Sequence, residues 1–267
     1  MDSTQSQHIV LHDKGGSRIY EQELIGEEPL LIKIEDQPYS VVMRTPGEEI
    51  FHVAGFCLGE GLVDDPDDFA MISHCNEIDS NVVSVRLEAE RKKKVAALLE
   101  RRGFISQTSC GICGKEMLKD LYQILEPVTD DIRIKTTQAV WCVEQLARHQ
   151  NFYERTGASH GVMVFDSELN VLALAEDVGR HNALDKAVGK VFIGRRLAEA
   201  RLAVLSSRVS YELVQKAARA GLSVLISISS PTALAVELGR NLNMTLVCAG
   251  NGSVVLVFCG EERLTRE

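Results

Sequence analysis

A pair of cysteines separated by two residues is the most distinctive chemical feature of the chain. Cys110 and Cys113 lie in the stretch TSCGICG at 108–114, and a stretch of helical character, 115–125, follows. The free N–H groups and positive dipole end of a helix N-terminus favour thiolate over thiol, and Lys115 adds positive charge nearby. A thiolate attacks sulfur or binds metal. The pair could therefore form a disulfide, hold half a metal site or carry a sulfur atom.

The other five cysteines do not supply a second close pair. Structural zinc sites usually combine two such pairs, whereas the remaining cysteines are isolated in the sequence: Cys57, Cys75, Cys142, Cys248 and Cys259. Zinc is therefore disfavoured, and no intrinsic metal is expected. A dithiol oxidoreductase remains an alternative, although the pair does not open a helix in a short βαβ pattern.

A second candidate site is the polar segment 176–186, which holds five charged residues, a histidine and an asparagine. The preceding predicted strand ends near Glu176, so Arg180, His181 and Asn182 should lie at the carboxyl end of a strand. Open α/β sheets bind ligands at that edge. The alternative is a solvated first helical turn in which His181 is paired with Asp185.

Two serine-rich stretches, 206–210 and 227–232, each follow a predicted strand. Hydroxyl groups at a helix N-terminus can hold phosphate, but they also serve as ordinary caps, with Ser230 the expected cap of the second helix. The presence of two such stretches, one of them containing Arg208, favours an anion site. The chain has neither a G-x-G-x-x-G helix start nor a Walker A lysine, which disfavours a standard dinucleotide or triphosphate site.

The whole chain has 267 residues, 45% of them hydrophobic, and a net charge of −9. Its length allows one large domain or two modest ones. The acidic balance argues against a nucleic-acid partner. The N-terminus has no apolar signal core, and no apolar run approaches the roughly 18 residues of a spanning helix. We therefore expect a cytoplasmic protein that does not associate with membranes.

The first half of the chain predicts a small α+β unit, with residues 1–17 frayed. Thr45 is expected to cap a helix that has Pro46 in its first turn and Glu48 completing a capping box. The basic run 91–94 is expected to be a solvated helix face. The predicted strands are 29–36, 39–44, 69–73 and 82–87, and the predicted helices are 45–60, 88–101 and 138–153.

The second half predicts an α/β layered domain with crossover helices. A hairpin, 161–165 with 171–175, is followed by alternating helices and strands, and the later strands are continuous apolar runs, as expected for strands covered on both faces. The predicted helices are 181–192, 210–220 and 231–242, and the predicted strands are 201–206, 223–228, 245–248 and 254–258. We place the domains at 1–130 and 131–267.

Together these segments resemble the formate dehydrogenase accessory sulfurtransferases, the FdhD/NarQ family. The resemblance extends from about Ile19 to Phe258, and its motifs follow the family's order at 28–30, 43–47, 55–61, 109–114, 176–186, 211–216 and 230–235. It implies a protein that takes persulfide sulfur from a cysteine desulfurase. The sulfur passes to the molybdenum (or tungsten) bis-guanine-dinucleotide cofactor, a bound substrate, before that cofactor enters formate dehydrogenase.

The resemblance also implies a cytidine-deaminase-like fold for the C-terminal domain. A deaminase itself is rejected, because His160 is followed by Gly161 and Val162 and no cysteine follows Pro231, so the zinc signature of that class is absent. Cytoplasmic enzymes are often homodimers, and a homodimer is among the assemblies we expect.

By position, Cys110 matches the family's persulfide carrier and Cys113 its partner, which assists transfer or resolves a disulfide. The resemblance implies that Arg180, His181, Asn182, Asp185 and Lys186 are cofactor-side groups, and that the nucleotide end is bound by the turn Ala249, Gly250, Asn251, Gly252, Ser253 and Val254. His160 and Arg208 are further candidate cofactor-binding residues. The chain departs from the family pattern at Ser207, at 157–159, and at Ala249 and Asn251, where an aromatic residue and an arginine are common.

The cofactor is expected to bind as a polyanion at the carboxyl end of the C-terminal sheet. Arg180, His181, Arg208 and the helix N-termini would supply there the positive field that the acidic chain otherwise lacks. Two alternatives from other classes remain. One is a cofactor-binding chaperone without sulfur chemistry, and the other is a dithiol redox protein.

Overall fold

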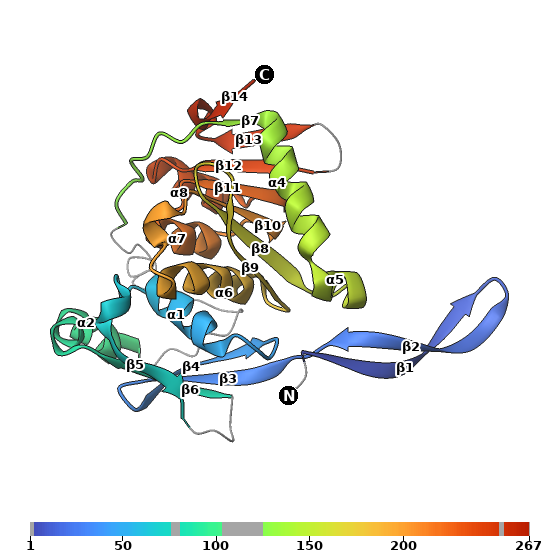
Figure 1. Ribbon diagram of the computed structural model, residues 1–267, viewed down its shortest axis with the longest axis horizontal. Coiled ribbons are helices and arrows are strands. Elements are labelled where there is room, and N and C mark those ends of the chain that lie inside the picture. Colours follow the sequence, from blue (N-terminus) through green and yellow to red (C-terminus); the bar gives the residue numbers. More distant parts are fainter. Residues whose placement is uncertain (1–2, 76–80, 103–124, 251–253, 267) are drawn as a thin grey trace.

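A computed structural model describes residues 3–75, 81–102, 125–250 and 254–266 of the chain. The described part contains two larger sheets, their covering helices and a separate hairpin (Figure 1). The cysteine pair, the helix expected at 115–125 and three residues of the C-terminal turn, 251–253, lie outside the described residues. No helix within the described ranges is long and apolar enough to cross a membrane.

The N-terminal residues form a hairpin that projects from the body of the molecule (Figure 1). Strands β1 (Thr4–Asp13) and β2 (Gly16–Ile25) pair antiparallel along their whole length. The expectation of a frayed segment at 1–17 was therefore wrong, because backbone pairing holds even this polar stretch. The base of the hairpin is attached to the body, since Arg155 donates to the two carboxylate oxygens of Glu23 at 2.5 and 2.8 Å.

The N-terminal sheet has the strand order β4-β3-β6-β5. Alternate side chains of β3 and β6 point into the core, as the period of a half-buried strand requires. The four strands lie where the sequence predicts them: β3 (Glu28–Ile34), β4 (Gln37–Arg44), β5 (Phe69–His74) and β6 (Val82–Leu87). Helices α1 (Glu49–Gly59) and α2 (Ala89–Arg102) and the short 3-10 turn η1 (Pro66–Asp68) complete this unit.

Helix α1 does not begin as the sequence predicts. Glu48 adopts a left-handed conformation with φ 65°, α1 starts only at Glu49, and no side chain caps it. Thr45 instead contacts the C-terminal half, where its hydroxyl accepts a hydrogen bond from the N–H of Val178 at 3.0 Å. The predicted capping role of Thr45 was wrong, because a contact more than 130 residues away in sequence takes up the same hydroxyl.

The basic run at 91–94 is only partly a solvated face. Lys92, Lys93 and Lys94 are exposed, but Arg91 is buried. Its guanidinium donates to the carbonyls of Leu62 and Gly61, both at 2.8 Å, and pairs with Asp64. The expectation for Arg91 was wrong, because this side chain satisfies carbonyl groups left free after the end of α1.

The C-terminal sheet has the strand order β13-β12-β11-β10-β8-β9, in which β10, β11 and β12 are parallel and the other pairs antiparallel. This confirms the predicted mixed α/β architecture. The strands are β8 (His160–Phe165), β9 (Val171–Asp177), β10 (Leu202–Arg208), β11 (Val224–Ser229), β12 (Thr245–Ala249) and β13 (Val255–Cys259). Two short strands, β7 (Ile134–Lys135) and β14 (Leu264–Thr265), pair separately.

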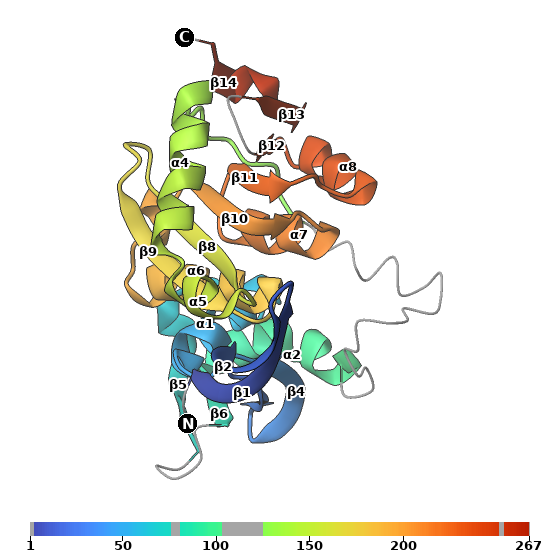
Figure 2. The ribbon, with the colours of Figure 1, turned by 90° about the vertical axis from the view of Figure 1, so that its right-hand side faces the viewer.

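Helices cover both faces of this sheet (Figure 2). Helices α6 (Arg180–Ile193), α7 (Tyr211–Arg219) and α8 (Ala233–Asn241) share one hydrophobic cluster with the sheet, and α4 (Thr136–His149) shares another on the opposite face. The single helix predicted at 138–153 is divided at Gln150 into α4 and α5 (Asn151–Thr156). The boundary near residue 130 remains a prediction, and one hydrophobic cluster includes residues from both sides of it.

Helices α1 and α6 cross in very close contact at two glycines. A Cβ on Gly189 would lie 1.8 Å from the carbonyl oxygen of Phe51, and one on Gly55 would lie 1.9 Å from that of Asp185. Any side chain at these two positions would push the helix backbones apart. The two glycines therefore allow the N-terminal unit to pack directly on the helix that carries the polar segment 180–186.

Candidate functional site at the carboxyl edge of the sheet

One edge of the C-terminal sheet gathers several of the predicted ligand residues. The parallel strands β10, β11 and β12 end there, β8 begins there at His160, and α6 begins there at Arg180. Arg208 ends β10 and is exposed. These side chains are close enough for their charges to influence one another. Burial is the larger cause of a lowered pKa at both Arg180 and His160, and the second cause is the charge of Arg208 at Arg180 and the charge of Arg180 at His160.

His181 belongs to this group but carries no charge at neutral pH. Burial, and after it the neighbouring charges with Arg180 first among them, lower its pKa to about 3. Its Nε2 lies 3.2 Å from the Ser210 hydroxyl and 3.0 Å from the Glu212 carboxylate, but Glu212 is largely exposed to water, which weakens its influence. The positive charge at this edge therefore comes from the two arginines.

The low pKa of His181 predicts a measurable loss of stability in acid. Between pH 6.5 and 3 the unfolded chain binds a proton at this histidine that the folded chain excludes, so stability falls as pH falls through that window. In His181→Gln we expect a shallower dependence of the unfolding free energy on pH, by up to about 1.4 kcal/mol per pH unit. Urea unfolding at pH 5, 6 and 7 measures it, and equal slopes for both proteins would refute it.

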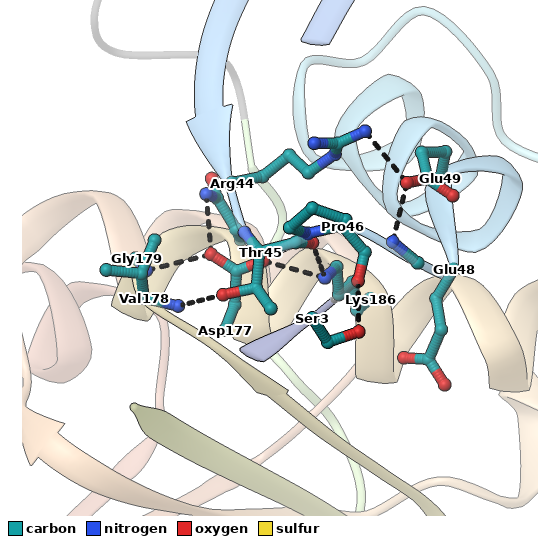
Figure 3. Close-up of polar contacts among 12 residues, drawn as sticks. Ser3, Arg44, Thr45, Pro46, Glu48, Glu49, Asp177, Val178, Gly179 and Lys186 are labelled. Atoms are coloured by element: carbon teal, nitrogen blue, oxygen red, sulfur yellow. Dashed lines mark hydrogen bonds and ion pairs between the residues drawn. The ribbon is translucent and has the colours of Figure 1, made fainter. Parts of the chain in front are cut away.

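Two buried charged residues of the polar segment, Asp177 and Lys186, join the two units (Figure 3). Lys186 donates to the carbonyl of Thr45 at 2.8 Å and pairs with Asp177 at 2.7 Å, and both charged side chains are buried. The carboxylate of Asp177 also accepts from the N–H groups of Thr45 at 3.0 Å and Gly179 at 2.8 Å. These contacts tie the end of β4 to the start of α6.

Asn182 uses both amide hydrogens in the same connection. Its Nδ2 donates to the carbonyl of Met43 at 2.7 Å and to Asp177 at 2.9 Å, and the residue is buried. The structure therefore brings His160, Arg180, His181 and Arg208 to one edge but places Asn182 beneath it. A role for Asn182 in binding the cofactor remains a prediction.

Asp185 pairs with a lysine that the sequence did not single out. Lys216, from α7, contacts both carboxylate oxygens of Asp185 at 2.6 and 2.7 Å, and its ammonium lies 5.2 Å from the centre of the Phe56 ring. Burial raises the pKa of Asp185 to about 6, against the opposing effect of Lys216. The alternative in which His181 pairs with Asp185 was wrong, because Asp185 pairs with Lys216 of α7.

Glu176 positions the loop that leads to His160. Its buried carboxylate accepts from the N–H groups of Phe152 at 2.8 Å and Tyr153 at 2.9 Å, which begin α5, and from the Ser159 hydroxyl at 2.6 Å. A carboxylate at a helix N-terminus satisfies free N–H groups and favours the helix dipole. The acidic residue at the end of the predicted strand was the only sequence signal for this role.

The two serine-rich stretches mostly satisfy backbone groups. Ser206 accepts a hydrogen bond from the N–H of Gly161 at 2.8 Å, and Ser227 donates to the carbonyl of Ser229 at 2.7 Å. Thr232, not Ser230, caps α8, because its hydroxyl accepts from the N–H of Ala235 at 3.3 Å. The expected cap was wrong by two residues.

A pocket of about 550 Å³ opens beside this edge, between α4, α5 and the ends of three strands. His160 lies on its polar side, and burial and then the charge of Arg180, one of the two arginines at the edge, lower the pKa of His160. The residues around it are Val143, Leu146, Ala147, Gln150, Tyr153, Gly157, Ala158, Ser159, His160, Ser206 and Ile228. Of the predicted nucleotide turn, Ala249 ends β12, Val254 precedes β13 and is exposed, and Asn251, Gly252 and Ser253 lie outside the described residues.

The chain is similar to known proteins over most of its length. Residues 25–265 match the model of the FdhD/NarQ family. A sulfur carrier protein FdhD of Anaeromyxobacter dehalogenans is 35% identical, over 97% of this chain and 93% of the relative. Proteins of the same name from Streptomyces avermitilis and Mycobacterium tuberculosis are 36% and 35% identical, over 90% and 91% of this chain and 88% and 92% of theirs.

A solved structure has the same fold. The crystal structure of a formate dehydrogenase accessory protein from Desulfotalea psychrophila matches with a TM-score of 0.77. The match covers 98% of this chain and 99% of that chain, at 23% sequence identity. At this identity the likeness establishes the fold.

Proposed function

Because the chain belongs to the FdhD/NarQ family, we propose that it is a sulfur carrier in the maturation of formate dehydrogenase. The support is the length and strength of the similarity to relatives that are named sulfur carriers. The cysteine pair Cys110 and Cys113 supplies the chemistry that such a role needs.

In the first step, the Cys110 thiolate attacks the terminal sulfur of a persulfide on a cysteine desulfurase. A new S–S bond forms on Cys110, the S–S bond of the desulfurase breaks, and the desulfurase cysteine leaves as a thiolate. Cys110 then carries the terminal sulfur, which passes to the molybdenum or tungsten bis-guanine-dinucleotide cofactor as substrate. Cys113 assists this transfer, or its thiolate attacks the Cys110 sulfur, so that a Cys110–Cys113 disulfide forms, the persulfide S–S bond breaks and the terminal sulfur leaves as sulfide.

The arginine pair at the carboxyl edge is the observation that best supports an anionic acceptor. Arg180 and Arg208 lie close enough for the charge of Arg208 to lower the pKa of Arg180. The buried Nε of Arg180 has no hydrogen-bond acceptor among the described residues. Two neighbouring guanidinium groups, one with a free donor, favour a bound polyanion such as a diphosphate. In this proposal the turn 249–254 contacts the nucleotide end, and the sheet with its helices is a cytidine-deaminase-like layer used for binding.

The sulfur carrier would work with two protein partners inside the cell. The donor is a cysteine desulfurase, the client is formate dehydrogenase, and both steps occur in the cytoplasm, where thiols stay reduced. A homodimer fits this role without being required for it.

Transfer of sulfur to Cys110 predicts a defined gain in mass. After incubation with desulfurase and cysteine, intact-mass spectrometry should show about 32 Da added to the protein, removable by a reducing thiol. Cys110→Ala should gain nothing, whereas Cys75→Ala, which removes an exposed cysteine elsewhere, should gain the same mass as the wild type. An equal gain by Cys110→Ala would show that Cys110 is not the carrier.

The two alternatives give different results in cells that lack the native protein. A chaperone without sulfur chemistry would support formate dehydrogenase activity with Cys110→Ala but not with Arg180→Ala. A dithiol redox protein would form an internal Cys110–Cys113 disulfide and no persulfide. A sulfur carrier that binds an anionic cofactor would lose this activity with either Cys110→Ala or Arg180→Ala.

A further inference from the structure

Helix α2 packs on the N-terminal unit with one side and presents lysines to solvent on the other. Val95 is buried and Leu99 is partly buried against the core, and they continue the inward stripe that begins at Arg91. The exposed side carries three consecutive lysines, Lys92, Lys93 and Lys94, which form the lysine face. Figures 1 and 2 place α2 at the outer end of the N-terminal unit, away from α4 and the C-terminal sheet.

The charge of α2 is opposite to that of the whole chain. Among its 14 residues six are basic and two are acidic, a net charge of +4, whereas the chain has a net charge of −9. Only Arg91 of the basic residues 91–94 is used inside the fold, where it donates to two carbonyl groups. A local positive surface on an acidic protein attracts a negatively charged partner to that place and not to others.

The lysine face is available to such a partner. Lys92 pairs with Glu35 at 2.5 Å and Lys93 with Glu90 at 2.8 Å, but the two lysine side chains are 54% and 73% exposed. Ion pairs in water contribute little to stability, so these ammonium groups can exchange their present partners for other carboxylates at small cost. Lys94 is exposed and has no ion pair within the described ranges.

Helix α2 also leads directly to the cysteine that would carry sulfur. The helix ends at Arg102, and Cys110 is the eighth residue after it. Eight residues of fully extended chain span at most about 29 Å, and the helix itself is about 21 Å long. A protein bound to the lysine face is therefore within one short length of chain of the Cys110 thiol. The arginine pair of the carboxyl edge belongs to the other unit.

The surface around the lysine face suits a protein better than a nucleic acid or a membrane. Carboxylates alternate with the cations, since Asp36 pairs with Arg86 at 3.0 Å beside the Lys92–Glu35 pair. These carboxylates would repel a phosphate backbone, whereas a protein surface can present charges of both signs. The exposed side of α2 described here has no aromatic or large apolar residue, which a membrane-bound helix needs.

We propose that the lysine face of α2 is the docking surface for an acidic patch on the persulfide donor, a cysteine desulfurase. The inference rests on the proposed function, because it assigns a surface to the protein that would supply the sulfur. Charge pairs at the rim of an interface act mainly on the rate of encounter. The lysine face would therefore set how fast Cys110 is loaded, and not how reactive its thiol is.

Charge reversal of the lysine face tests the proposal in the full chain. With limiting persulfurated desulfurase at low salt, Lys92→Glu/Lys93→Glu/Lys94→Glu should gain the persulfide mass at least about tenfold more slowly than the wild type. Loading from cysteine persulfide, a small donor that needs no docking, should be the same in both proteins, which also shows that the variant is folded. Equal rates with the desulfurase would overturn the proposal.

A matched variant separates the lysine face from the net charge of the protein. Lys14→Glu/Arg18→Glu/Arg148→Glu makes the same change in charge at exposed positions on the hairpin and α4. It should slow loading by less than about threefold. A loss as large as that of the α2 variant would overturn the proposal. Raising the salt from about 20 to 300 mM should slow the wild type much more than the α2 variant.

Binding measured without sulfur transfer distinguishes this proposal from the sulfur-carrier role. Desulfurase should bind Cys110→Ala at least about tenfold more tightly than the same protein with the three lysines reversed. If that holds but the wild type never gains the mass, the carrier role is overturned and the docking surface stands. Equal binding by the two proteins overturns the docking surface alone. If the lysines instead hold a short DNA duplex more tightly than the desulfurase, the face belongs to nucleic acid and the proposal is overturned.

Discussion

Replacement of Lys186 by methionine is expected to lower the free energy of unfolding by about 3–5 kcal/mol. Lys186 and Asp177 form an ion pair of 2.7 Å, and both side chains are almost completely buried. Removal of the lysine leaves the carboxylate buried without its counter-charge, although Thr45 and Gly179 still donate to it. Urea unfolding followed by the fluorescence of Trp141, the only tryptophan in the chain, measures the loss.

Two further proteins make this result specific. Lys93→Met removes one partner of an exposed pair with Glu90 and should change stability by less than about 1 kcal/mol. The double variant Asp177→Asn/Lys186→Met should be more stable than the sum of its single changes predicts, because no buried charge remains unpaired. A loss below about 1 kcal/mol in Lys186→Met would show that water reaches the pair.

Gly189→Ala is expected to destabilise the protein by about 3 kcal/mol or more, although glycine-to-alanine changes inside helices usually stabilise. The new methyl group would lie 1.8 Å from the carbonyl oxygen of Phe51 and 2.9 Å from the backbone nitrogen of Gly55. Both contacts are with backbone, so no side chain can turn aside, and α1 must move away from α6. Thermal unfolding of the variant at pH 7 measures the effect.

Gly221→Ala is the matched control for this change. Gly221 has φ 70° and no atom within 4 Å of its expected Cβ, so alanine there strains only the backbone, by about 1–2 kcal/mol. If Gly189→Ala is no more destabilised than Gly221→Ala, then the two helices are not in the close contact described. The same comparison with Gly55→Ala tests the second half of the crossing.

The sequence predicted the C-terminal sheet well, because its strands have a simple physical signature. Runs such as 202–205 and 224–226 are apolar without alternation, and the structure covers them on both faces. The glycines, prolines and serines between these runs mark where the chain turns. The order of helices and strands, and hence the edge at which polar residues collect, follows from that pattern.

The polar segment 176–186 shows what a sequence pattern does not predict. Lys186 and Arg180 are both basic and lie less than two helical turns apart on α6. Lys186 is buried in the connection between the two units, whereas Arg180 lies at the open edge of the sheet. Helical periodicity gives the face of a residue but not what covers that face. Thr45, whose partners are more than 130 residues away, was misassigned for the same reason.

The pocket was missed because its residues come from separate elements and none has an unusual type. Gln150 lies in a polar stretch that reads as helix, and only the break between α4 and α5 turns it toward the sheet. Gly161 leaves room for the Gln150 side chain that lies against it, a contact that is visible only in the structure. Such a site depends on three-dimensional proximity, which a pattern along one chain does not contain.

The connection between β4 and α6 has a consequence for how strongly the carboxyl edge can bind. Asp177, Gly179 and Asn182 are fixed by hydrogen bonds and burial immediately around Arg180. The backbone that carries this arginine therefore loses its conformational freedom when the protein folds and not when a ligand arrives. An anion at this edge binds to a preorganised cation, with little entropy of ordering to oppose it. Variants that loosen the connection should weaken such binding even though they alter no group that touches the anion.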